Sequence, residues 1–202
     1  MYEGHGVRLC QGGLLRDLKL LERVELVKGA DGEDELKVVE TSLPYAIMLS
    51  QDCDLEWDHG FRAKTPIQNH DKFLTAMLVS PAYPAGQVRL GTHLEAEGMK
   101  MQALNSALWN PITTNNNERY HYLAADPALN LPELVLDFKR YRTVPRETLM
   151  ECMANGHAIA ALKPLFRERL SQRFANYLSR IGLPEALPPA APSVVATVAI
   201  PA

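Results

Sequence analysis

Apolar and polar residues alternate, or form short unbroken apolar runs, through the first two-thirds of the chain. Residues 24–28 and 37–41 flank an acidic turn containing two glycines and predict a β-hairpin. The unbroken runs 45–50 and 73–80 are typical of strands buried on both faces, the second ending at Pro81. Two further strands are predicted at 119–123 and 133–138. Short strands with mostly non-helical connections predict an antiparallel sheet or small barrel.

The hydrophobic period lengthens to about 3.6 residues after Pro145. Thr143 is predicted to be the N-cap of a helix that Asn155-Gly156 ends. Pro164 then opens a second helix, which Gly182 ends. The apolar stripe of this helix consists of Phe166, Leu170, Phe174, Tyr177, Leu178 and Ile181.

The order of these elements predicts an α+β protein. Residues 1–144 are expected to form the barrel, with an inserted helix at about 92–109. Residues 145–183 are expected to form helices packed on that barrel. The Pro- and Ala-rich segment 184–202 is predicted to be an extended tail, whose apolar end is also suited to adding a strand to a partner's sheet.

Composition narrows the class of protein. The chain has 202 residues, 47% of them apolar and 22% charged, which suits one globular domain. Its three cysteines form no CxxC pair, so we expect reduced thiols and neither a metal nor another cofactor. The chain has no signal-like apolar start and no run of about 18 apolar residues, so a cytoplasmic protein without membrane contact is expected.

Charge is divided unevenly along the chain. Residues 1–60 contain six Lys/Arg and thirteen Asp/Glu, whereas residues 139–180 contain nine Lys/Arg and three Asp/Glu. This division predicts two faces, one of which is suited to an anionic partner. The alternative is that the charges only keep helix faces in solution.

The densest polar cluster follows the first buried run and consists of Ser50, Gln51, Asp52, Cys53 and Asp54. We expect this segment to be a polar loop that leaves the sheet, where binding sites commonly lie. Asp52 and Asp54 are suited to a hard metal or to backbone amides, and Cys53 to nucleophilic attack if a base lies nearby. The alternative is that the acids cap a turn and Cys53 packs as a small apolar residue.

Two further features are candidates for chemistry. His121 alternates with tyrosines in a predicted strand and is either a general acid or base or a hydrogen-bonded structural residue. A basic run near the end of the last predicted strand is suited to phosphates or to an acidic protein. Its members are Lys139, Arg140, Arg142 and Arg146, with Tyr141 among them.

Three segments together resemble the MazF/PemK-like toxin family, whose fold is a small SH3-like barrel with a C-terminal helix. Residues 43–50 (LPYAIMLS) are similar to the family's "RPALVLS" strand, and residues 74–81 (LTAMLVSP) to its "LVxVxPIT" strand. Residues 136–145 (LDFKRYRTVP) are similar to its "LDQxxTVD" strand. The chain resembles a divergent branch that carries an SQxCDL motif.

The resemblance also implies functional residues, and here the chain departs from the family. The family's arginine and threonine act in RNA cleavage, but Leu43 stands at the first position and Ser80–Pro81 near the second. A leucine side chain cannot stabilise the negative charge that develops on the phosphate. RNA cleavage by the family's route therefore requires that Arg62, Arg119 or Arg142 takes the place of the missing arginine in the folded protein. A related branch is a regulator that holds a sigma factor in CRISPR-linked proteolytic signalling.

These observations leave three hypotheses open, and with them whether the protein is an enzyme. The first is a non-catalytic or weakly catalytic regulator of prokaryotic defence or stress, which binds an antitoxin or a sigma-like factor. The second is an endoribonuclease toxin that cleaves single-stranded RNA with Ser80, Arg119 and His121. The third is a cysteine- or metal-dependent hydrolase built on the 52–54 segment. A homodimer is compatible with the first two.

Overall fold

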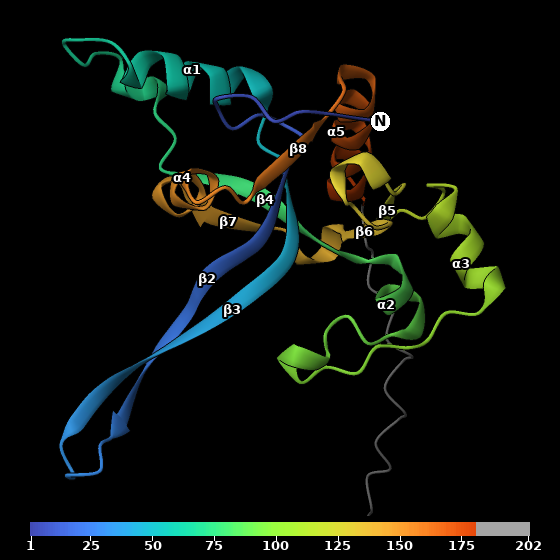
Figure 1. Ribbon diagram of the computed structural model, residues 1–202, viewed down its shortest axis with the longest axis horizontal. Coiled ribbons are helices and arrows are strands. Elements are labelled where there is room, and N and C mark those ends of the chain that lie inside the picture. The colour runs from blue at the N-terminus through green and yellow to red at the C-terminus, as the bar shows by residue number, and fades with distance from the viewer. Residues whose placement is uncertain (181–202) are drawn as a thin grey trace, which may run out of the picture.

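The computed structural model describes residues 1–180, which form an α+β fold around one curled antiparallel sheet (Figure 1). Its strands are β1 (Tyr2–Glu3), β2 (Gly13–Lys28), β3 (Asp34–Met48), β4 (Ala76–Pro84), β5 (Tyr120–Leu123), β6 (Leu134–Asp137), β7 (Arg142–Pro145) and β8 (Ala158–Leu162). Its helices are α1 (Asp52–Arg62), α2 (Ala85–Leu90), α3 (Ser106–Thr113), α4 (Arg146–Ala154) and α5 (Pro164–Leu178). The strand order is β1-β8-β2-β3-β4-β6-β5, with β7 beside β4.

The two apolar runs are both strands of this sheet, as predicted, and they lie side by side in it. Ile47 of β3 pairs with Ser80 of β4, and both residues are fully buried. The apolar pattern predicted that this strand ends before Pro81. In the structure β4 continues to Pro84. On its other edge β4 pairs with β7 up to Val79 and with β6 from Ala82 onward. Pro81 is tolerated because it falls between these two partners, where no ladder hydrogen bond is needed on that edge.

Helices cover both faces of the curled sheet. On one face, Leu170 and Phe174 of α5 pack among alternate residues of the strands. On the other face, one cluster includes Leu55 of α1 and Leu149 of α4, and a second packs α2 and α3 over β4 and β6. The Tyr2 hydroxyl donates to the Ala124 carbonyl at 2.9 Å and ties β1 to the chain after β5. The sheet is therefore a partly closed barrel. This shape is compatible with the predicted small antiparallel barrel.

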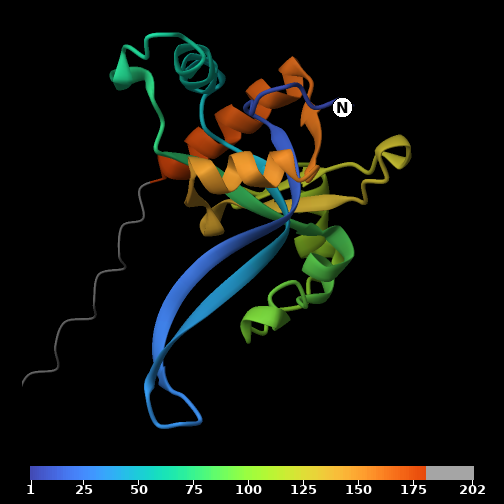
Figure 2. The same ribbon diagram turned by 60° about the vertical axis from the view of Figure 1, so that its left-hand side comes forward.

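The predicted hairpin is confirmed and is longer than expected. β2 and β3 pair from Leu14↔Ile47 out to Lys28↔Asp34. Figures 1 and 2 show its outer half as a twisted two-stranded ribbon that extends away from the other elements. Its inner half lies in the sheet, where Leu18 and Leu43 are paired and buried.

Two predictions about helices are wrong. Residues 52–62 are not a polar loop but form α1, whose first-turn residues Asp52 and Asp54 favour a helix N-terminus. No single helix spans 92–109. Gly98 has a φ of 72° after a short turn at Glu95–Glu97, and α3 begins only at Ser106. The apolar residues between Gly98 and α3 belong to an irregular segment. Among them, Met99, Met101 and Leu104 pack on the core.

The C-terminal third also differs in part from prediction. Thr143 is no N-cap, because it pairs with Leu78 inside β7, and Pro145 precedes α4. The segment predicted to be wholly helical contains β8, which pairs with β1 and β2. The helix opened by Pro164 is confirmed as α5. Its expected end at Gly182 and the predicted tail at 184–202 lie outside the described residues.

Candidate functional site

The three residues assigned to RNA cleavage lie close together in the sheet, but each is occupied by a structural contact. Ser80 is fully buried in β4, and its Oγ lies 3.3 Å from the carbonyl oxygens of Pro81 and Asp137. Arg119 donates two hydrogen bonds to the buried Asp137 carboxylate, at 2.7 and 2.5 Å. Asp137 also accepts from the Lys139 backbone N–H at 3.1 Å. These contacts fix the end of β6.

His121 is 4% exposed and accepts a hydrogen bond at Nδ1 from Arg173 Nε at 2.9 Å. Its ring packs beside Phe138, with 6.1 Å between ring centroids. Burial, together with the positive charges of Arg173 and Arg169, lowers the pKa of His121 to about 3. The imidazole is therefore neutral at physiological pH, and its Nδ1 lone pair is already used. This geometry matches the structural alternative for His121 better than a general base.

The polar segment after β3 forms the start of α1. Ser50 Oγ accepts from the Leu78 backbone N–H at 2.8 Å. Asp52 accepts from Arg8 at 3.1 Å, from the Gln11 backbone N–H at 3.1 Å and from Arg167 at 3.0 Å. Burial raises the pKa of Asp52, but these hydrogen bonds and charges outweigh it and lower the pKa below its ordinary value.

These contacts leave little for the hydrolase hypothesis. Asp52 is held by two arginines. Cys53 is exposed, and within the described part of the chain its Sγ has only Gln51 and Asp54 as side-chain hydrogen-bond partners. Among residues 1–180, no group of three or more His, Cys, Asp or Glu is placed to hold a metal ion. Sequence reasoning missed the roles of Arg8 and Arg167, because their contacts with Asp52 span 44 and 115 positions.

The basic run is partly neutralised by the protein itself. Arg140 pairs with Glu97, and Arg146 Nε pairs with Asp58 at 2.7 Å. Asp58 is 2% exposed and also accepts from Arg62 at 2.7 Å and from the Leu74 backbone N–H at 2.9 Å. Arg62 and Arg119, two of the arginines expected to substitute in cleavage, are therefore each committed to a buried carboxylate. Lys139 and Arg142 have no ion pair within the described chain and are the members still suited to an anionic partner.

Four exposed apolar side chains lie next to one another on the outer hairpin. Val24 pairs with Val38 and Leu26 with Leu36, which places all four side chains on one face of the ribbon. Their exposed fractions are 49%, 54%, 66% and 73%, respectively. The opposite face is more polar and includes the pair Glu25↔Lys37. We call Val24, Leu26, Leu36 and Val38 the hairpin face.

Sequence reasoning found this hairpin but did not identify its face as functional. Alternation predicts one apolar side on each strand, and that side is ordinarily buried against a core. The signal available was this alternation, but it does not show whether another element covers the apolar side.

Comparison with models of known protein families, with curated proteins and with solved structures finds no match to this chain. Within residues 1–180, none of the helices has the length and apolar character needed to cross a bilayer.

Proposed function

We propose that this protein acts by binding a protein partner through the hairpin face, and not by catalysis. The observation that supports this most strongly is the pair of exposed apolar cross-strand contacts, Val24↔Val38 and Leu26↔Leu36, on a ribbon that extends from the body. Contiguous apolar surface of this kind on a soluble protein typically marks an interaction site. A two-stranded ribbon is also only marginally stable in water without a covering element.

The net charge of the ribbon indicates which kind of partner surface would complement it. Residues 21–40 contain seven Asp/Glu and three Lys/Arg, a net charge of −4. A complementary partner surface is apolar at its centre and carries Lys or Arg around its rim. An antitoxin or a sigma-like factor, the partner classes implied by the resemblance to MazF/PemK-like proteins, is the occupant we propose. The role is then regulation in a prokaryotic defence or stress response.

The packing of the proposed cleavage residues argues for the non-catalytic role. Ser80 and His121 are buried in the sheet, and Arg119 is held by Asp137. Leu43, at the position of the family's arginine, is 1% exposed and paired with Leu18 inside the sheet. A developing negative charge on phosphate needs preorganised donors directed at it, and these groups are directed at the protein instead.

The proposal is tested by removing the apolar face while keeping the strands. The Leu26→Thr/Leu36→Thr variant places a β-branched residue, which favours strands, at each position and keeps the net charge unchanged. Since burying a leucine contributes about 1.5–3 kcal/mol, we expect affinity for the host partner to fall by about 100-fold or more. The measurement is the amount of a stoichiometric partner that co-purifies from the host, followed by titration with that purified partner.

Glu25→Gln/Lys37→Gln is the matched control, because it alters the opposite face and leaves the net charge unchanged. We expect this control to retain the partner within about threefold. Equal retention by the leucine variant and the wild type would exclude the hairpin face as the binding surface.

The nuclease alternative has its own test. We expect no cleavage of single-stranded RNA by the purified protein and no growth arrest on expression. Cleavage without added metal that is lost in both Arg119→Lys and His121→Gln, with folding intact by circular dichroism, would overturn the non-catalytic assignment.

A further inference from the structure

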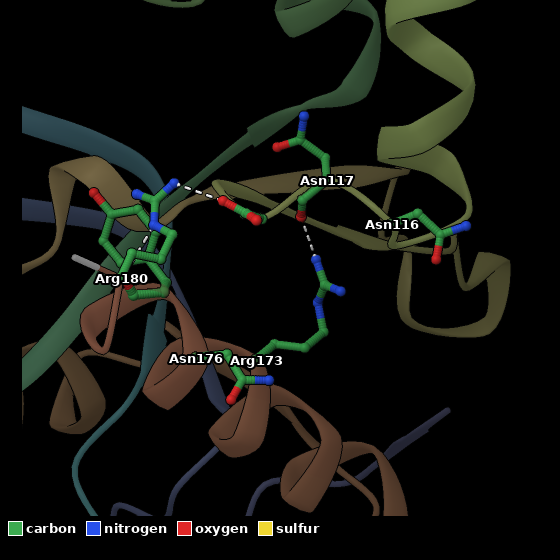
Figure 3. Close-up of a pocket in the computed structure, with 7 residues that line it drawn as sticks. Asn116, Asn117, Arg173, Asn176 and Arg180 are labelled. Atoms are coloured by element: carbon green, nitrogen blue, oxygen red, sulfur yellow. Dashed lines mark hydrogen bonds and ion pairs between the residues drawn. The ribbon is translucent and has the colours of Figure 1, made fainter. Parts of the chain in front are cut away.

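A polar groove separates the end of α5 from the chain between α3 and β5, far along the sheet from the hairpin face. Figure 3 shows the groove as an open space between side chains of these two segments. Its cavity volume is about 210 Å³. The residues around it are Asn116, Asn117, Glu118, Arg173, Asn176, Tyr177 and Arg180.

Arg173 places a positive charge in this groove, and no carboxylate among residues 1–180 forms an ion pair with it. Its guanidinium donates to His121 Nδ1 at 2.9 Å, and to the carbonyl oxygens of Asn115, of Asn117 at 2.5 Å and of Tyr120 at 2.9 Å. All of these acceptors are neutral. Burial and the nearby Arg169 lower the pKa of Arg173 below its ordinary value, as expected for an uncompensated charge.

Arg180 supplies a second guanidinium, at the opposite side of the groove. Its Nη1 lies 3.0 Å from Glu118 Oε2, and its guanidinium carbon lies 4.2 Å from the centroid of the Tyr177 ring. Glu118 and Arg180 are 73% and 43% exposed at their side chains, so water weakens this ion pair. The groove thus contains two positive charges and one loosely held negative charge.

We infer that this groove binds one small oxyanion, a phosphate group carried either as inorganic phosphate or as a phosphate monoester. Within the described residues, one Nη1 hydrogen of Arg173 and both Nη2 hydrogens of Arg180 have no protein acceptor. The two guanidinium groups lie on opposite sides of the groove (Figure 3). This arrangement suits a tetrahedral anion, since guanidinium groups form strong charge-assisted hydrogen bonds to phosphate. The cavity is smaller than the roughly 300–1,000 Å³ typical of pockets for larger ligands, which limits the site to a single such group.

The test titrates inorganic phosphate and, separately, a nucleoside 5′-monophosphate into the full chain by calorimetry, in phosphate-free buffer of low ionic strength. Arg180→Gln removes one guanidinium at an exposed position, and we expect the affinity for both probes to fall about tenfold. Glu118→Gln removes the competing carboxylate, and we expect the affinity to rise about threefold. Lys64→Gln is the matched control for loss of one positive charge, because Lys64 lies outside the groove and packs over Phe61, and we expect it to bind like the wild type.

Two results decide the source of the phosphate. Tighter binding of the monophosphate than of inorganic phosphate assigns the site to a phosphate ester, and the reverse order assigns it to the free ion. No binding of either probe at about 10 mM would overturn the inference. Equal affinities in the wild type, Arg180→Gln and Glu118→Gln would overturn it as well, because the anion would then bind elsewhere.

Discussion

At the scale of single residues, arginine holds this fold together by pairing with carboxylates that are buried or half-buried. Asp58, Asp52 and Asp137 each accept hydrogen bonds from at least one arginine that is distant in the sequence. Asp58 joins α1, the segment before β4 and the start of α4. Burial raises the pKa of Asp58, but its hydrogen bonds from Arg146, Arg62 and Leu74 outweigh this and lower the pKa.

Substitution of Asp58 measures how much its ion pairs and hydrogen bonds contribute to the free energy of unfolding. We expect Asp58→Asn to lower the free energy of unfolding by about 3 kcal/mol, because two arginines lose their buried counter-charge. Urea denaturation followed by circular dichroism provides the value. Glu56→Gln, an exposed change on the same helix, is expected to stay within about 0.5 kcal/mol. A loss below about 1 kcal/mol in Asp58→Asn would contradict the role assigned to this residue.

His121 makes stability depend on pH in a defined window. Its pKa of about 3 in the folded protein lies below the ordinary value near 6.5, so the unfolded chain binds the proton more readily. The contribution of neutral His121 is therefore complete above about pH 6.5 and is lost as the pH falls from there toward 3. Between pH 7 and pH 5 this amounts to about 2 kcal/mol.

Two measurements check this prediction. The imidazole resonances of His121 in nuclear magnetic resonance spectra are expected not to titrate between pH 8 and pH 5. The free energy of unfolding of His121→Gln is expected to depend less on pH over this range than that of the wild type. A titration midpoint for His121 near pH 6.5 would show that the ring is neither buried nor held by Arg173.

The sequence shows which polar and charged side chains are present, but it does not show which of them pair with each other. The cluster around Asp52 and the basic run stand out as polar groups in the sequence. Their pairing depends on contacts such as Arg8–Asp52 and Arg146–Asp58, which only the folded chain creates. The charge split of the sequence likewise did not show which lysines and arginines the protein would neutralise itself.

At the scale of elements, the sequence predicted strands better than helices. The hairpin, β4 and α5 have strong apolar patterns, and the structure contains all three. α1 has few apolar residues, so its pattern resembled a loop. The alanine-rich β8 has helical composition, and it is a strand because β1 and β2 offer it hydrogen-bonding edges.

The outer hairpin is expected to contribute little to the stability of the body. Replacing residues 24–38 with Asn-Gly joins Arg23 directly to its pairing partner Val39 through a favourable two-residue turn. Because the removed residues are mostly exposed, we expect the unfolding midpoint temperature to change by less than about 4 °C. Differential scanning calorimetry measures this shift. Unfolding of the whole domain after the deletion would show that the ribbon is a structural element and not a binding arm.

At the scale of the whole molecule, the fold separates a packed body from a projecting arm. The body contains Ser80, Arg119 and His121, each buried or paired within the protein. The arm exposes apolar side chains, and the residues around them are mainly acidic. The sequence predicted an antiparallel, barrel-like sheet with a helical C-terminal part. It could not predict that the hairpin leaves the sheet, since this depends on which strands the other elements cover.

The most direct test of the binding role is site-specific photo-crosslinking in the host. A photoreactive side chain at Val38 lies on the hairpin face, and one at the adjacent Lys37 lies on the opposite face. We expect Val38 to give one dominant cross-linked protein whose yield falls as salt is raised, and Lys37 to give little. No cross-link from Val38, or equal yields of the same products from both positions, would contradict the proposal that this protein works by presenting its hairpin face to a partner.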